Sequence, residues 1–271
     1  MQVVYTKNIE KYCCRLETCS TIILSPRGQS GYYEGLHFNQ ADINKEGEER
    51  KISIIYPFYQ YGCYKEYSPE HTQYYIPGSS IKGAIGSSDL GIDDMPVNYK
   101  DIKLRKLYKV QYASETEKVA ENKKVKLEEF FKQLGIEMLN RKVYLSGDAF
   151  GRGEPELFLS KVRSDTAQKL FQLDKRLEEI IENNIIGTGE DVRIDTKSVL
   201  LKVRENIKEK MYKAQYLEKN SAFIFLGGYK GLLLSKVYGE ADPLNGGIYI
   251  DIENNLPHGL AKISLERRSD D

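Results

Sequence analysis

The sequence predicts an α+β fold. Strand-like segments come first, a long helical segment lies in the second half, and strands with glycine turns close the chain. The chain has 271 residues, of which 40% are hydrophobic and 20 are tyrosine. This content suits a unit with a substantial core. No linker rich in proline or glycine and no repeat divides the chain, so we expect one unit over residues 1–271, with residues at about 163–219 as a candidate helical subdomain.

In the first half, β-branched runs that stop at proline or glycine predict strands. Between two of these runs lies a polar stretch, NQADINKEGEER, which predicts an exposed loop. A third strand leads through Pro77-Gly78-Ser79-Ser80 into a short helix. The expected elements are strands over 12–24, 52–56 and 74–76, and the helix over 81–85.

In the second half, the apolar residues after Asp165 recur at helical spacing, and Asp165 itself is a plausible N-cap. Before this helix, an alternating basic segment predicts a strand with one exposed face. The expected elements are strands over 102–107, 141–145, 222–226 and 260–265, and helices over 127–139, from Asp165 onward and over 198–217.

The composition excludes several classes of protein. The apolar runs are far shorter than a membrane span of about 20 residues, and the first residues do not form a signal peptide, so we expect a cytoplasmic protein. Forty basic residues balance forty acidic residues, which excludes a uniformly basic nucleic-acid-binding domain. The charges are nevertheless uneven: residues 99–126 carry nine basic and four acidic residues, whereas residues 166–191 carry three and six. We expect the basic segment to line the path of a bound polyanion and the acidic segment to face solvent or a partner.

The cysteines and histidines do not form a metal-binding pattern. Four cysteines lack C-x-x-C spacing, and the histidines are His37, His71 and His258. We therefore expect free thiols in a reduced compartment, with no metal and no cofactor.

The first informative motif is Tyr75-Ile76-Pro77-Gly78-Ser79-Ser80-Ile81-Lys82-Gly83-Ala84-Ile85. Amides at a helix start attract phosphate, and the two serines and the lysine add donors and one charge. The same residues also suit an ordinary capped turn between a strand and a helix. The spacing is not that of a nucleotide-binding P-loop.

The second motif is the segment 225–236, FLGGYKGLLLSK. Its glycines allow a ligand to approach the backbone without a Cβ in the way. Lys230 supplies charge, and Tyr229 is a candidate for stacking on a base. The simpler interpretation is a glycine-rich turn with a solvated lysine.

The string IPGSSIKGAI resembles the signature of the RAMP superfamily, the repeat-associated proteins that build type III CRISPR effector complexes. Other segments agree in the same order: Leu24-Ser25-Pro26 with Gly28, then Ser146-Gly147-Asp148, and finally 226–235 and 256–263. The resemblance implies ferredoxin-like βαββαβ units of the RNA-recognition type, with a helical insert in the second half. It also implies glycine-rich segments that contact guide RNA. Many members continue the first motif with an arginine, where this chain has Gly86-Ser87-Ser88. One phosphate contact is therefore expected to be either missing or supplied elsewhere, by Arg105 or Lys106.

The resemblance thus implies a non-catalytic subunit of a Csm-type interference complex. It would bind guide RNA (crRNA) and would contribute to assembly and antiviral defence. Within the family, the chain most resembles the subunit that caps the 3′ end of the guide. The implied partners are guide RNA, other RAMP subunits and target RNA, with no membrane. The residues expected to bind RNA are Arg27, Gly28, Ser79, Ser80, Lys82, Gly83, Lys103, Arg105, Lys106, Gly227, Gly228, Tyr229, Lys230 and Gly231.

Two catalytic alternatives remain open. A backbone subunit of the same complex would cut target RNA through an acidic loop residue and a metal ion, and Asp89, Asp93 and Asp94 follow the first motif. A stand-alone, metal-independent endoribonuclease would use a histidine such as His37 or His71 to process guide RNA. Neither histidine has a catalytic pattern around it, so we expect no catalytic residue.

Overall fold

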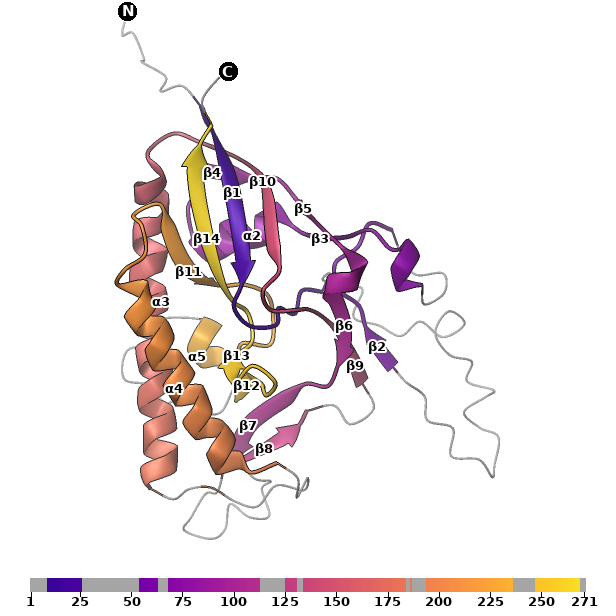
Figure 1. Ribbon diagram of the computed structural model, residues 1–271, viewed down its shortest axis with the longest axis vertical. Coiled ribbons are helices and arrows are strands. Elements are labelled where there is room, and N and C mark those ends of the chain that lie inside the picture. Colours follow the sequence, from indigo (N-terminus) through magenta and orange to yellow (C-terminus); the bar gives the residue numbers. More distant parts are fainter. Residues whose placement is uncertain are drawn as a thin grey trace, which may run out of the picture.

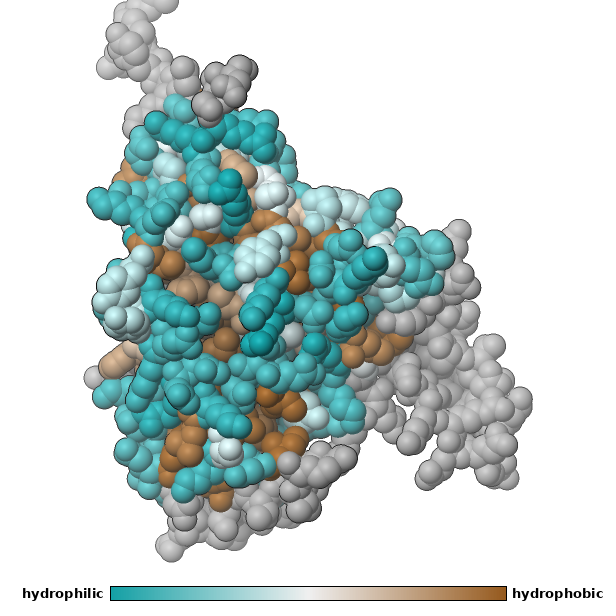
Figure 2. Space-filling view, viewed as in Figure 1, coloured by the Kyte–Doolittle hydropathy of each residue, from teal (hydrophilic) through white to brown (hydrophobic). Residues whose placement is uncertain are grey.

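The computed structural model describes residues 9–25, 54–62, 68–112, 125–130, 134–183, 186, 194–235 and 247–268. These residues form an α+β fold of several antiparallel sheets with packed helices, as the sequence predicts (Figure 1). Among them, no helix is both long and apolar enough to cross a membrane. The face drawn in Figure 2 is largely hydrophilic, with small apolar patches in its centre and lower part.

The main sheet has the strand order β11-β14-β1-β10-β4, and every neighbouring pair is antiparallel. Alternation explains its central strand, because Tyr12, Cys14 and Leu16 are buried on one face while Lys11 and Arg15 are exposed on the other. The strands are β1 (Glu10–Thr18), β4 (Leu90–Ile92), β10 (Tyr144–Gly151), β11 (Ser221–Phe225) and β14 (Leu260–Arg267).

Helices cover the buried face of this sheet and leave its other face open (Figure 1). Helix α2 (Gly78–Ile85) and the first turns of α3 (Pro155–Glu182) pack onto it. The rest of α3 pairs with α4 (Thr196–Ala214). A half-buried ion pair joins the two helices, with Arg204 Nε 2.9 Å from an oxygen of Asp174.

Two of the smaller sheets lie below the main sheet in Figure 1, and the pair of β3 and β5 lies beside it. One has the order β13-β12-β7-β8, and another has the order β2-β9-β6 with β2 parallel to β9. The pair consists of β3, which comes just before α2 in the chain, and β5, which comes after it. Their bounds are β2 (Ile54–Tyr56), β3 (Tyr74–Ile76), β5 (Met95–Val97), β6 (Ile102–Arg105), β7 (Tyr108–Tyr112), β8 (Val125–Glu129), β9 (Leu134–Leu139), β12 (Ile248–Asp251) and β13 (Leu256–Pro257), with the short helix α5 at Leu232–Ser235 and 3-10 turns at Pro69–His71 and Tyr99–Asp101.

The core is divided between these layers. One hydrophobic cluster lies between the main sheet, α2 and the start of α3. A second fills the space between α3, α4 and the sheet that contains β12. A small third cluster contains Ile23, Met138 and Tyr249 and joins the end of the β1 segment to the lower sheets.

Several predicted elements are wrong in type or bounds. The helix expected over 127–139 is absent: β8 and β9 lie there, paired with β7 and β6. Helix α3 begins at Pro155 rather than Asp165, because a proline at the first helical position suits a helix start and the buried stripe already begins at Phe158. Strand β10 continues through Ser146-Gly147-Asp148 instead of ending there, since these residues pair with β1.

Candidate functional site

The two glycine motifs meet at one cleft. Ser80 and Gly83 of α2 line a cavity of about 350 Å³, and so do the loop residues from Gly227 to Lys230. Its remaining wall includes Ile23 to Ser25, Tyr56 and Tyr59. We call this cavity the glycine cleft. Neither motif predicts by itself that the other is its neighbour.

Helix α2 owes its position to one glycine. A Cβ on Gly78 would lie 1.8 Å from the backbone oxygen of Ile92, so only glycine allows the helix to start so close to β4. Ile81 and Ile85 are buried in the core beneath the helix. Because neighbours on a helical face are three or four residues apart, Ser80 and Gly83 share the side that lines the cleft.

The remaining residues of the first motif lie elsewhere on α2. Ser79 is exposed and Lys82 is half-buried, and neither lines the glycine cleft. The described part of the chain offers Lys82 no ion-pair partner.

The start of α2 is already occupied by a carboxylate. The amide of Gly78 donates to Oδ1 of Asp94 at 2.8 Å, and the Tyr61 hydroxyl donates to Oδ2 at 3.2 Å. A phosphate at this helix start would therefore have to compete with a carboxylate that fills the same role. This geometry favours the side of α2 that carries Ser80 and Gly83 as the contact surface.

The second motif needs glycine at two positions because of close backbone packing. Gly227 has φ +87°, and its Cβ would lie 2.3 Å from the carbonyl oxygen of Ile23. Gly231 has φ +80°, and its Cβ would lie 2.1 Å from the oxygen of Gly247. Gly228 differs: its amide donates to Ile23 at 2.8 Å, yet the nearest atom to an added Cβ is 3.9 Å away. Gly228 therefore leaves open space in the cleft.

Tyr229 and Lys230 are packed rather than free in solvent. The Tyr229 ring makes edge contacts with Tyr56 and Tyr249, with centroids 5.7 Å and 5.4 Å away, and burial raises its pKa well above the usual value. Lys230 Nζ donates to the carbonyl of Phe225 at 3.3 Å. Burial lowers the pKa of Lys230 to about 8, and repulsion from Lys169 adds to the decrease.

Lys169 is a residue that sequence reasoning missed. It projects from α3 near Lys230, and burial lowers its pKa although Asp165 opposes the change. Two partly buried lysines close together create a positive potential that an anion would relieve. The signal in the sequence is a single lysine next to buried Leu170, which is too weak to stand out.

The basic strand predicted to contact RNA lies apart from the cleft. Lys103 of β6 is exposed. Arg105 pairs with Glu253 and donates to Oδ1 of Asn140 at 2.9 Å. Lys106 Nζ lies 2.7 Å from a carboxylate oxygen of Glu129. The structure therefore brings neither Arg105 nor Lys106 to the two glycine motifs.

The remaining candidates divide into described and undescribed residues. Arg27, Gly28 and His37 lie outside the described residues. His71 is exposed and lies 2.7 Å from the Ser68 hydroxyl, and Asp89 and Asp93 are exposed. Within the described ranges, no group of three or more His, Cys, Asp or Glu could hold a metal ion, and the thiols of Cys13, Cys14 and Cys19 are free.

No protein-family model matches the chain, and no curated protein is significantly similar to it.

Proposed function

We propose that this chain is a non-catalytic guide-RNA-binding subunit of a type III CRISPR interference complex, located at the 3′ end of the guide. The observation that carries the proposal is the glycine cleft. The two motifs that most resemble the RAMP superfamily are far apart in sequence, yet both line this one cavity. In this role the protein would work in the cytoplasm with other RAMP subunits, and the guide would pair with target RNA.

The strand order supports a ferredoxin-like unit. Along the chain, β1, α2, β4, β10, α3 and β14 occur as βαββαβ, and the four strands have the spatial order β14-β1-β10-β4. Both helices lie on the same face (Figure 1). In this arrangement β11 extends the edge beside β14, and α4 is part of the insert between α3 and β11.

The chemistry of the cleft suits the RNA backbone. Exposed Gly83 and Gly228 let an RNA strand approach closely, while Ser80 and Lys230 offer hydrogen-bond donors. Such contacts hold a phosphate or a sugar without reading the sequence of bases. A subunit that accepts guides of any sequence needs this kind of contact.

The test is to fill the cleft without disturbing the fold. No atom lies within 4 Å of the Cβ that Gly83→Leu adds, and leucine favours a helix more than glycine does. We expect this variant to keep or raise its melting temperature and to bind labelled single-stranded RNA at least tenfold more weakly. Fluorescence anisotropy measures the binding.

Ser164→Leu is the matched control, since it adds the same side chain to an exposed turn of α3. Full RNA affinity is expected for this variant. If Gly83→Leu is folded and binds RNA like the wild type, the cleft does not hold RNA and the proposal fails.

A cleavage assay separates this function from the catalytic alternatives. Asp89, Asp93 and Asp94 are all exposed, but the Asp94 carboxylate is already engaged by Gly78 and Tyr61. We expect no cutting of guide or target RNA, with or without Mg²⁺ or Mn²⁺. Metal-dependent cutting that is lost when all three aspartates are alanine would identify a cutting subunit, and metal-independent cutting lost in His37→Ala or His71→Ala would identify a processing nuclease.

A further inference from the structure

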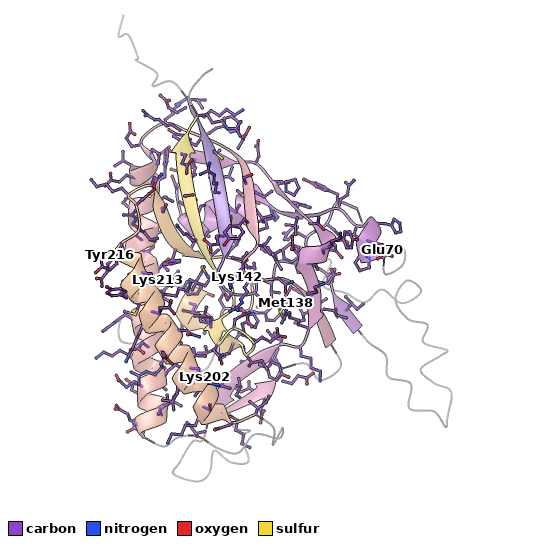
Figure 3. The ribbon with its side chains drawn as sticks, in the orientation of Figure 1. Glu70, Met138, Lys142, Lys202, Lys213 and Tyr216 are labelled. Atoms are coloured by element: carbon purple, nitrogen blue, oxygen red, sulfur yellow. The ribbon has the colours of Figure 1, made fainter. Side chains whose placement is uncertain are left out.

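A second cavity lies between the turn after β6 and the turn after β12. Its volume is about 250 Å³, and we call it the His258 cavity. Leu104, Tyr108 and Met138 supply its apolar walls, and Met138 is labelled near the centre of the molecule in Figure 3. Arg105, Glu253 and His258 are among its polar lining residues. Arg105, Lys106 and the segment 256–263 stand out in the sequence, but no motif predicts that they meet at one cavity.

A hydrogen-bond network fixes the tautomer of His258. The Thr21 hydroxyl and amide both donate to Oδ2 of Asp251 at 2.9 Å. Thr21 thereby uses its single hydroxyl proton. His258 Nδ1 lies 2.7 Å from the hydroxyl oxygen of Thr21, so Nδ1 must be the donor of that hydrogen bond. In a neutral ring the other nitrogen, Nε2, then carries no proton and can only accept a hydrogen bond.

His258 Nε2 has no hydrogen-bond partner within the part of the chain that the structure describes. The residue is 2% exposed, so water does not solvate this acceptor freely. Burial lowers the pKa of the ring to about 4, although the Asp251 carboxylate and the backbone of Thr21 and Ile250 oppose the change, so the ring is neutral at pH 7. A buried acceptor without a partner is costly and calls for a ligand that donates.

The charges around the cavity do not suit a phosphate. Arg105 is paired with Glu253, and Lys106 is paired with Glu129. Asp251 also accepts from the backbone and side chain of Asn254. The charges are therefore balanced, while Arg105 Nε has no hydrogen-bond partner within the described residues. The cavity favours a neutral ligand with apolar faces whose edge offers an N–H donor to His258 and an acceptor to Arg105.

The position of the cavity relates it to the glycine cleft. Thr21 lines the His258 cavity, and Ile23, Leu24 and Ser25 line the cleft. At about 3.3–3.6 Å per residue, Thr21 and Ser25 lie no more than about 14 Å apart. One RNA strand can therefore contact both. The smaller cavity lies below the roughly 300 Å³ at which drug-sized pockets begin, which suits a single base better than a whole nucleotide.

We propose that the His258 cavity binds one nucleobase of the RNA strand held at the glycine cleft, with a base N–H donating to His258 Nε2. The inference rests on the proposed function, because it assigns a second contact to the same strand. Adenine, cytosine and guanine carry amino groups that can serve as this donor. The cavity thus adds a base contact to the sequence-independent contacts of the cleft.

The test uses free nucleosides and the full chain. The sequence contains only three histidines, so ¹⁵N labelling of histidine rings gives few side-chain signals by NMR. We expect adenosine, cytidine or guanosine, at concentrations on the order of millimolar, to shift the His258 Nε2 signal. Adenosine binding is expected to be lost with N6,N6-dimethyladenosine, which lacks the amino hydrogens, if adenosine is the nucleoside that binds.

Variants place the effect in the cavity. Leu104 is 45% exposed at the cavity wall, so Leu104→Trp can fill the space with little cost to the fold. We expect this variant to lose the nucleoside-induced shift, while Leu157→Trp on exposed α3 keeps it. The inference is overturned if no nucleoside shifts the signal or if Leu104→Trp leaves the shift unchanged.

This result is independent of the proposed function. Nucleosides carry no phosphate, so the folded Gly83→Leu variant should still bind them in the His258 cavity. If Gly83→Leu weakens RNA binding but nucleosides do not shift the signal, only the base pocket is refuted. If nucleosides bind and Gly83→Leu keeps full RNA affinity, only the role of the glycine cleft is refuted.

Discussion

At the scale of single residues, His258 links stability to pH. Its folded-state pKa is about 4, below the usual value of about 6.5, because the ring is buried. Between about pH 4 and pH 6.5, His258 therefore binds a proton more readily in the unfolded chain than in the folded one. The contribution of His258 is therefore complete above about pH 6.5 and is lost as the pH falls towards 4, a difference of about 3 kcal/mol at 1.36 kcal/mol per pKa unit.

The measurement is urea unfolding at pH 7 and at pH 4.5. His258→Gln cannot titrate, so its free energy of unfolding should depend less on pH than that of the wild type. His71→Gln is the control, because the side chain of His71 is 81% exposed and makes few native contacts. Equal pH dependence in the wild type and His258→Gln would contradict the predicted effect of burial.

Two adjacent glycines should differ sharply in their tolerance of a side chain. Gly227→Ala forces alanine into a left-handed backbone, which costs roughly 1–2 kcal/mol, and the overlap with Ile23 adds to this. Gly228→Ala meets open space and should change stability by no more than about 0.5 kcal/mol. Thermal unfolding of both variants checks the difference, and similar destabilisation by both would show that the loop packs otherwise.

At the scale of elements, Asp94 stabilises a helix from a distant segment. Its carboxylate accepts from the first amide of α2, a role usually filled by the residue that precedes the helix. Asp94→Ala should lower the free energy of unfolding by about 1 kcal/mol, as loss of an N-cap does. Asp94→Asn, which keeps an acceptor, should retain most of the stability.

Asp93→Ala is the matched control. The backbone amide of Asp93 donates a hydrogen bond to the carbonyl oxygen of Asp148, and the substitution leaves this bond in place. Denaturant midpoints of the three variants test the assignment. A loss in Asp93→Ala as large as that in Asp94→Ala would show that the effect comes from the charge of the loop and not from the cap.

The sequence predicts an element well where the spacing of apolar residues fits only a helix or only a strand. The stripe from Leu170 to Ile180 suits a helix alone, and α3 is found there. Between 127 and 139, however, Leu127, Phe130 and Leu134 also recur at helical spacing. In the structure β7 and β6 supply partners for β8 and β9, and pairing across the chain overrides the local pattern.

The candidate site shows the same division between local and distant information. Glycine spacing is local, so the sequence predicts that the second motif, which contains Gly228, is open to a ligand. The meeting of the two motifs, the cap from Asp94 and the network between Thr21, Asp251 and His258 all depend on contacts between distant segments. No periodicity or short motif encodes such contacts.

At the scale of the whole molecule, the distribution of charge in the sequence overstates the free positive charge. Within the basic segment 99–126, Arg105 and Lys106 are neutralised by Glu253 and Glu129, which lie outside it. Residues 113–124 of this segment lie outside the described residues. Any attraction for a polyanion such as RNA would therefore depend on which lysines lack a partner and not on the number of lysines in a run.

Lys82 and Lys106 test this argument against each other. If RNA runs past α2, Lys82→Ala should weaken RNA binding and reduce the slope of log affinity against log salt by about 0.7, the value for one phosphate of a single strand. Lys106→Ala should change the slope much less, because Glu129 already neutralises this lysine. Anisotropy titrations over a series of KCl concentrations measure both slopes. If Lys106→Ala reduces the slope as much as Lys82→Ala does, RNA must displace Glu129, and the path of the strand would follow the turn after β6 rather than α2.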